Sequence, residues 1–196
     1  MADVPRGESA AVGGDGTTGT GRRPRTVLGW FVGAALLVLV ADIVTKVLAV
    51  DALQGRGPVR LFGGAVYLVL IRNSGAAWGL AAGYTIVLSL VAVVVVAVII
   101  RFVRRLGSRP WAVALGMILG GATGNLVDRL FRAPGPLRGA VVDFISLFDN
   151  SGDVWPVFNV ADSALVIGVL IAVGLELAGR RFDGSRAKAP SPGRDA

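Results

Sequence analysis

Residues 120–130, GGATGNLVDRL, close a long apolar run with a group of polar side chains. Asn125, Asp128 and Arg129 lie within five positions at the end of a segment that is otherwise suited to crossing a bilayer. Ionisable groups are costly inside a membrane, so those that occur there usually serve a function. The stretch therefore predicts a membrane-spanning helix with a functional site near its end.

The composition of the whole chain supports a membrane protein. Of its 196 residues, 54% are hydrophobic and only 17% are charged, and the mean hydropathy is +0.68. These values are too apolar for a soluble domain of this size. The net charge of +7 comes from arginines between the apolar runs and near the ends of the chain, which indicates a cytoplasmic membrane surface rather than nucleic acid as their partner.

Two residue types are missing altogether, and their absence limits the chemistry. Without Cys, the chain has no disulfide, no thiol nucleophile and no Cys-ligated zinc. Without His, it has no His-dependent triad, His metal site or imidazole proton relay. Carboxylates are then the leading candidates for catalysis, and we expect neither a metal nor a cofactor.

Long apolar runs predict an all-α polytopic membrane protein with four transmembrane helices. The expected helices cover about 26–50, 77–102, 110–131 and 154–178. Between them, residues 58–73 and 138–147 contain β-branched and aromatic stretches that predict strands, which would form a small β-rich platform and lid.

The ends of the chain differ from this core. Residues 1–25 are rich in Gly, Thr and Arg, and residues 179–196 are polar and basic, so both are predicted to be disordered tails flanking one domain, 26–178. The tails and the middle loop together hold thirteen Lys and Arg, whereas the two longer connections hold five. The positive-inside rule therefore places both termini in the cytoplasm and the platform outside.

Two similar polar elements occur in the third and fourth predicted helices. Asn125 precedes Asp128 by three residues in NLVD, and Asn159 precedes Asp162 by three in NVAD, so each pair shares a helix face. Asp162 is expected about seven residues into its helix, roughly 10 Å along the axis, at a depth similar to that of Asp128. Two such carboxylates in one pocket would divide into an acid and a base, as in an aspartic protease. The alternative is that both only link helices through hydrogen bonds.

The first predicted helix carries DIVTK, in which Asp42 and Lys46 lie one turn apart. They are interpreted as an ion pair within the helix, or as a snorkelling lysine, although they could also order the site or its lid. A Ser–Lys dyad of Lys46 with Ser74 or Ser163 is a further possibility. It is disfavoured because it leaves the two matched aspartates without a role.

Three other polar residues have a structural interpretation, and two of them also have a functional one. Asn73 could cap the second helix or bind a ligand. Arg129 could anchor the helix at the interface or hold a lipid phosphate or a substrate carbonyl. Asp143, in VVDF, could be a solvated loop residue.

Five segments together resemble the lipoprotein signal peptidase family, also called signal peptidase II: DIVTK, NSGAAWG, GGATGNLVDR, VVDF and FNVADSA. They occur in the family's order across roughly residues 40–170. The resemblance implies a multi-pass aspartic endopeptidase of the bacterial cytoplasmic (inner) membrane, with its active site near the extracytoplasmic face. Its substrates would be prolipoproteins carrying diacylglycerol on a Cys, cleaved just before that Cys. Membrane lipid would be the other partner, and we expect a monomer.

The same resemblance assigns residues. By motif match, Asp128 and Asp162 take the catalytic positions. The remaining matched positions would bind substrate or order the site: Asn73, Asn125, Arg129, Asn159, the supporting Asp143, and the pair Asp42 and Lys46. Ile43 stands where the family usually has Gln.

Two other functions remain open from the residues alone. A small proton- or cation-coupled membrane transporter would use the acidic residues as a relay, although they cluster near one face. A scaffold protein would use the Gly-rich helix faces for packing. Asp→Asn changes should abolish cleavage in a peptidase and ion flux in a transporter, with little effect in a scaffold.

Overall fold

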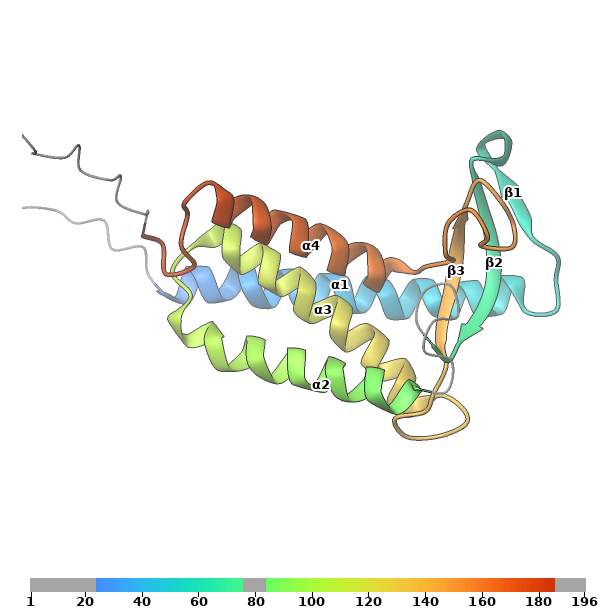
Figure 1. Ribbon diagram of the computed structural model, residues 1–196, viewed down its shortest axis with the longest axis horizontal. Coiled ribbons are helices and arrows are strands. Elements are labelled where there is room, and N and C mark those ends of the chain that lie inside the picture. The colour runs from blue at the N-terminus through green and yellow to red at the C-terminus, as the bar shows by residue number, and fades with distance from the viewer. Residues whose placement is uncertain (1–23, 76–83, 186–196) are drawn as a thin grey trace, which may run out of the picture.

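The computed structural model describes residues 24–75 and 84–185 (Figure 1). Most of both predicted tails lies outside the described residues. Residues 179–185, predicted as part of the second tail, instead fold back on the connection before the third helix. There the Phe182 carbonyl accepts hydrogen bonds from the backbone N–H groups of Gly107 (2.9 Å) and Ser108 (3.2 Å).

Four helices dominate the described chain, and each is long and apolar enough to cross a membrane. They are α1 (Pro24–Leu53), α2 (Thr85–Phe102), α3 (Arg109–Phe131) and α4 (Val160–Leu177). Helix α1 begins and α4 ends at one end of the bundle, and a small sheet lies across the other end (Figure 1). The predicted fold class is confirmed.

Two helix starts differ from the prediction. The described part of α2 begins at Thr85, after the N-cap residue Tyr84; the predicted start at 77 lies outside the described residues. Helix α4 begins at Val160, six residues later than predicted. The apolar run before it is not helical, because Phe158 makes an antiparallel bridge with Ile145.

Helix α3 is the most enclosed of the four and packs between α1 and α4. Adjacent glycines allow this close approach on two sides. A Cβ on Gly120 would lie 2.6 Å from the Ala35 carbonyl oxygen of α1, and one on Gly121 would lie 2.5 Å from the Ala161 carbonyl oxygen of α4. Small residues let helix backbones pack tightly in membranes, where the hydrophobic effect does not drive helices together.

The predicted platform is an antiparallel sheet with the strand order β1–β2–β3. Its strands are β1 (Val59–Leu61), β2 (Val66–Asn73) and β3 (Val141–Leu147), and a 3₁₀ turn, η1 (Phe62–Gly64), follows β1. Asn73 pairs with Val141 at the edge of the β2–β3 ladder nearest the helix ends. The last strand also contacts the chain before α4, where Phe144 and Ile145 donate to the Phe158 carbonyl at 3.1 and 2.9 Å.

Candidate active site

The start of α4 brings Asp162 to the sheet end of the bundle. Asn159 is the N-cap, and its Oδ1 accepts a hydrogen bond from the Asp162 backbone N–H at 3.0 Å, while Asp162 Oδ2 accepts from the Asn159 N–H at 3.2 Å. This reciprocal capping box satisfies two backbone donors that the helix leaves unpaired. Asp162 therefore lies in the first turn of α4, and the prediction that it lies about seven residues into the helix is wrong.

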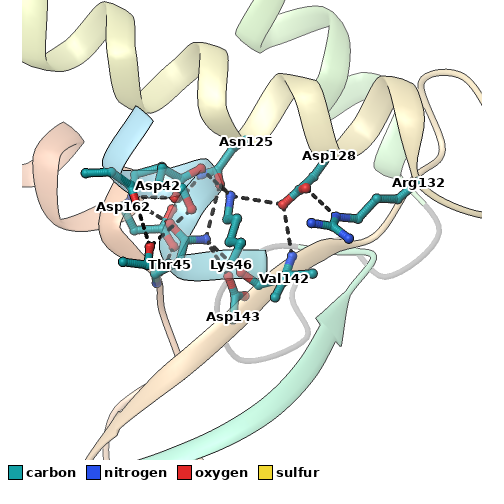
Figure 2. A network of polar contacts seen from close by, with 12 residues as sticks. Asp42, Thr45, Lys46, Asn125, Asp128, Arg132, Val142, Asp143 and Asp162 are labelled. Carbon is teal, nitrogen blue, oxygen red and sulfur yellow. Dashed lines mark hydrogen bonds and ion pairs between the residues drawn. The ribbon is translucent and has the colours of Figure 1, made fainter. Parts of the chain in front are cut away.

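Asn125 joins α3 to this turn. Its Nδ2 donates to Asp162 Oδ1 at 2.7 Å, and its Oδ1 accepts from Asn159 Nδ2 at 3.1 Å. The two Asn-x-x-Asp elements were predicted to face one pocket, and three of their four residues do contact one another: Asn125, Asn159 and Asp162. The fourth, Asp128, points to a different set of partners (Figure 2).

Asp143 lies in the middle of β3 and is only 2% exposed. Its Oδ1 accepts from Asn159 Nδ2 at 2.6 Å, and its Oδ2 accepts from Asn73 Nδ2 at 2.9 Å. Burial in the protein, followed by the negative charge of Asp162, raises the pKa of Asp143 to about 7. Asp143 is therefore no solvated loop residue, and it is electrostatically coupled to Asp162.

Asp128 is enclosed by cations and by backbone. Its Oδ2 lies 2.9 Å from Lys46 Nζ and accepts from the Val142 N–H at 3.1 Å, and its Oδ1 contacts Arg132 Nε (Figure 2). Both oxygens of this carboxylate therefore have partners within the protein.

Lys46 is 1% exposed, so it is buried in the bundle rather than snorkelling to the interface. Its Nζ pairs with Asp42 Oδ2 at 2.7 Å, which confirms the predicted ion pair one helical turn apart. It also donates to Asn125 Oδ1 at 3.0 Å. With the ion pair to Asp128, the described contacts of the ammonium are two carboxylates and one amide oxygen, and none of them is the serine that a Ser–Lys dyad needs.

Asp42 also connects α1 to α4. Its Oδ1 accepts a hydrogen bond from the Ala161 backbone N–H at 3.0 Å, in the first turn of α4. Gly124 of α3 lies against this contact, because a Cβ there would be 2.5 Å from Asp42 Oδ2. Any side chain at position 124 would displace the carboxylate that holds α1 and α4 together.

A cavity of about 380 Å³ opens beside these groups at the sheet end. Its polar lining includes both Asp143 and Asp162, whereas Asp128, Asp42 and Lys46 are not among the described residues that line it. The full described lining is Asn73, Gly75, Leu88, Asn125, Arg129, Val141, Asp143, Trp155, Pro156, Val157, Phe158, Asp162 and Val166.

Arg129 and Asn73 also reach this cavity. Arg129 Nη2 donates to the Gly75 carbonyl at 3.2 Å, and its buried Nη1 has no hydrogen-bond partner within the described ranges. Besides holding Asp143, Asn73 accepts from the Gly75 N–H at 2.9 Å, which forms a turn at the end of β2. Asn73 is thus not the cap of α2, which begins at Thr85.

Sequence reasoning missed Arg132 and the Val142 N–H as partners of Asp128, and it missed the wall from Trp155 to Phe158. One signal could have given Asp143 more weight. It is the single charged residue in the largely apolar strand VVDFISL, and a charge in such a strand is buried only where it is paired or functional.

The family of the chain follows from comparison with known proteins. The family model described as Signal peptidase (SPase) II matches residues 34–177, which include every candidate site residue. The chain belongs to the signal peptidase II family. It is therefore a membrane peptidase of the aspartic class that processes the signal peptides of prolipoproteins.

Individual relatives agree with this family. The chain is 53% identical to a lipoprotein signal peptidase of Mycobacterium avium (strain 104) over 176 residues, covering 89% of this chain and 94% of the relative. It is 49% identical over 189 residues to that of Mycobacterium tuberculosis (strain ATCC 25618 / H37Rv), covering 93% and 91%. Among solved structures, a bacterial membrane enzyme determined by the in meso method at 2.3 Å superposes with a TM-score of 0.64. It is 28% identical, and the match covers 76% of this chain and 88% of that structure's chain.

Proposed function

We propose that this signal peptidase cleaves diacylglyceryl-modified prolipoproteins just before the lipidated Cys, using Asp143 and Asp162 to activate a water. One observation carries the assignment: both carboxylates line the same cavity, and Asn159 bonds to each of them. This pair replaces the predicted pair of Asp128 and Asp162, because the oxygens of Asp128 are taken up by Lys46, Arg132 and the Val142 N–H.

The environments of the two carboxyl groups support different roles. With a pKa of about 7, Asp143 is protonated in a large fraction of molecules at neutral pH and can donate its proton to the scissile carbonyl oxygen. Asp162 accepts a proton from the water that attacks the carbonyl carbon. The tetrahedral intermediate then breaks its C–N bond, and the proton held by Asp162 moves to the leaving amine. One hydroxyl of the intermediate returns its proton to Asp143 as the new carboxyl group forms, so both residues regain their starting states.

Arg129 supports binding of the peptide. Arg129 lines the cavity, and its buried Nη1 has no hydrogen-bond partner within the described ranges, so a substrate backbone carbonyl would satisfy it. The apolar lining, which includes Leu88, Val157 and Val166, suits apolar side chains of a peptide substrate. The acyl chains of the substrate would stay in the surrounding lipid.

The distribution of arginines indicates which side of the membrane the cavity faces. The arginine-rich loop between α2 and α3 lies at the end of the bundle opposite the sheet. We infer from the positive-inside rule that this end faces the cytoplasm of a bacterial inner membrane and that the cavity faces outward. A relay across the membrane is disfavoured because the charged residues of the described helix interiors gather at the sheet end.

The test is cleavage of a diacylglyceryl-modified prolipoprotein in membranes that contain the wild type, Asp143→Asn or Asp162→Asn at matched levels. Each single change should reduce the rate by about 10²–10⁴-fold, the usual contribution of general acid–base catalysis. An unmodified prolipoprotein should remain uncut. Cleavage at close to the wild-type rate by either variant would remove that residue from the pair.

A further inference from the structure

The amide of Asn125 has a single orientation that suits its neighbours. On one side, its Oδ1 accepts from Lys46 Nζ at 3.0 Å and from Asn159 Nδ2 at 3.1 Å. On the other side, its Nδ2 donates to Asp162 Oδ1 at 2.7 Å. A half-turn of the amide would point its NH₂ group at two donors and its carbonyl oxygen at a carboxylate.

Lys46 is the charged member of this arrangement. Its ammonium does not line the cavity, and Figure 2 shows it between Asn125 and Asp128, on the far side of the amide from Asp162. A hydrogen bond from a cation is roughly twice as strong as one between neutral groups, so the lysine constrains the amide more than Asn159 does.

We propose that Lys46 is a positioning residue for the peptidase reaction: its ammonium fixes the Asn125 amide, which in turn presents an N–H donor to Asp162. This inference rests on the proposed role of Asp162 in catalysis. The lysine is not among the described residues that line the cavity, so it acts on the reaction through Asn125.

The ion pairs around Lys46 make it possible to bury its charge next to Asn125. A lone ammonium at this depth would be very costly, whereas Asp42 at 2.7 Å and Asp128 at 2.9 Å offset its charge. Arg132 in turn offsets the second carboxylate. The ion pairs thereby hold one ammonium in place, and its hydrogen bond is directed at the Asn125 oxygen.

The experiment separates positioning from folding by using charge balance. Lys46→Met removes the ammonium at similar volume, and Asp42→Asn/Lys46→Met removes the charge pair together, leaving Asp128 with Arg132. The amide introduced by Asp42→Asn keeps an oxygen that can accept from the Ala161 N–H. Purified variants in lipid are assayed for kcat and KM on a diacylglyceryl-modified prolipoprotein, and their thermal unfolding is recorded.

We expect kcat to fall by about 10- to 100-fold in both lysine variants, the range for losing a hydrogen bond to a charged group, with KM changed by no more than about twofold. In an Asn125→Ala background, the charge-balanced change should cost no more than about twofold further, because the relay is already broken. This non-additivity is the sign of a residue that acts through another.

Three results would overturn the inference. These are a kcat restored to the wild-type value in the charge-balanced variant, an undiminished effect of the lysine change in the Asn125→Ala background, or failure of both lysine variants to fold. In each case Lys46 would serve the fold alone. Asp143→Asn and Asp162→Asn are run in the same assay: if they cleave normally, the proposed pair fails, whatever the lysine variants do.

Discussion

Two pairs of carboxylates lie at the sheet end of the bundle, and their surroundings differ sharply. Asp143 and Asp162 receive hydrogen bonds from asparagine side chains and backbone, and both reach the cavity. Asp42 and Asp128 share Lys46, and neither is among the described residues that line the cavity.

The difference in surroundings suggests different roles for the two pairs of carboxylates. Amide donors hold the carboxylates that line the cavity, whereas Lys46, Arg132 and backbone N–H groups contact the oxygens of the other pair. On the proposed assignment, the same residue type serves catalysis in one pair and the fold in the other, and the neighbours decide which.

The largest expected effect comes from exchanging Asp for Asn in each pair. Asp143→Asn should reduce cleavage by about 10²–10⁴-fold and leave thermal unfolding nearly unchanged. Asp128→Asn should lower the free energy of unfolding by about 3–5 kcal/mol, because it breaks a buried ion cluster. Its activity per folded molecule should fall far less. An Asp128→Asn protein that melts like the wild type but does not cleave would return Asp128 to the catalytic pair.

The next effect tests the packing behind the ion cluster. Gly124→Ala would bring a methyl group to 2.5 Å from Asp42 Oδ2, and we expect a loss of about 1–3 kcal/mol in unfolding free energy, as for other overpacked cores. Gly33→Ala on α1 is the matched control, since nothing lies within 4 Å of its Cβ position. It should be neutral or slightly stabilising. Equal melting temperatures for the two variants would show that α3 can move away from Asp42.

The pH dependence sharpens the difference between the pairs. If protonated Asp143 is the acid, kcat/KM should fall about tenfold per pH unit as the pH rises above about 7, because the group then loses its proton. The Asn73 hydrogen bond lowers the pKa of Asp143, so Asn73→Leu should move this fall to higher pH. Rate profiles of the two proteins between about pH 5 and 9 give the measurement. A fall unaffected by Asn73→Leu would assign it to another group.

The smallest expected effect concerns Ser163. Its Oγ donates to the Asn159 carbonyl at 3.0 Å, in the manner of an ordinary helix serine. Ser163→Ala should therefore change the cleavage rate by no more than about twofold. A loss approaching that of Asp143→Asn would revive a serine mechanism with Lys46.

Much of the architecture could be predicted because it depends on local patterns. Long apolar runs predicted the helices, and the β-branched stretches YLVLI and VVDFISL predicted β2 and β3. The start of α4 could not be predicted in the same way. The residues from Trp155 to Phe158 continue the apolar run, but Phe158 bridges to Ile145, a contact that no local pattern records.

In the candidate site, too, local patterns could be predicted and long-range contacts could not. Asp162 and its asparagines were found because Asn-x-x-Asp is a local spacing. The matched spacing in NLVDR also favoured Asp128, and there it was misleading as a guide to geometry. Which carboxylate meets Asp162 depends on how β3 pairs with the chain before α4, through the bonds of Phe144 and Ile145 to Phe158. Such long-range pairing places Asp143 in the cavity.

The hydrogen bond from Ala161 to Asp42 spans 119 positions of the chain, from the last helix to the first. During synthesis α1 leaves the ribosome long before α4, so Asp42 and Lys46 enter the bilayer without the partners that complete their site. Asp162 is itself among the last membrane residues to be made. If Asp143 and Asp162 are the catalytic pair, as proposed, a nascent chain lacks it, and proteolytic activity should begin only when the final helix has been inserted and docked.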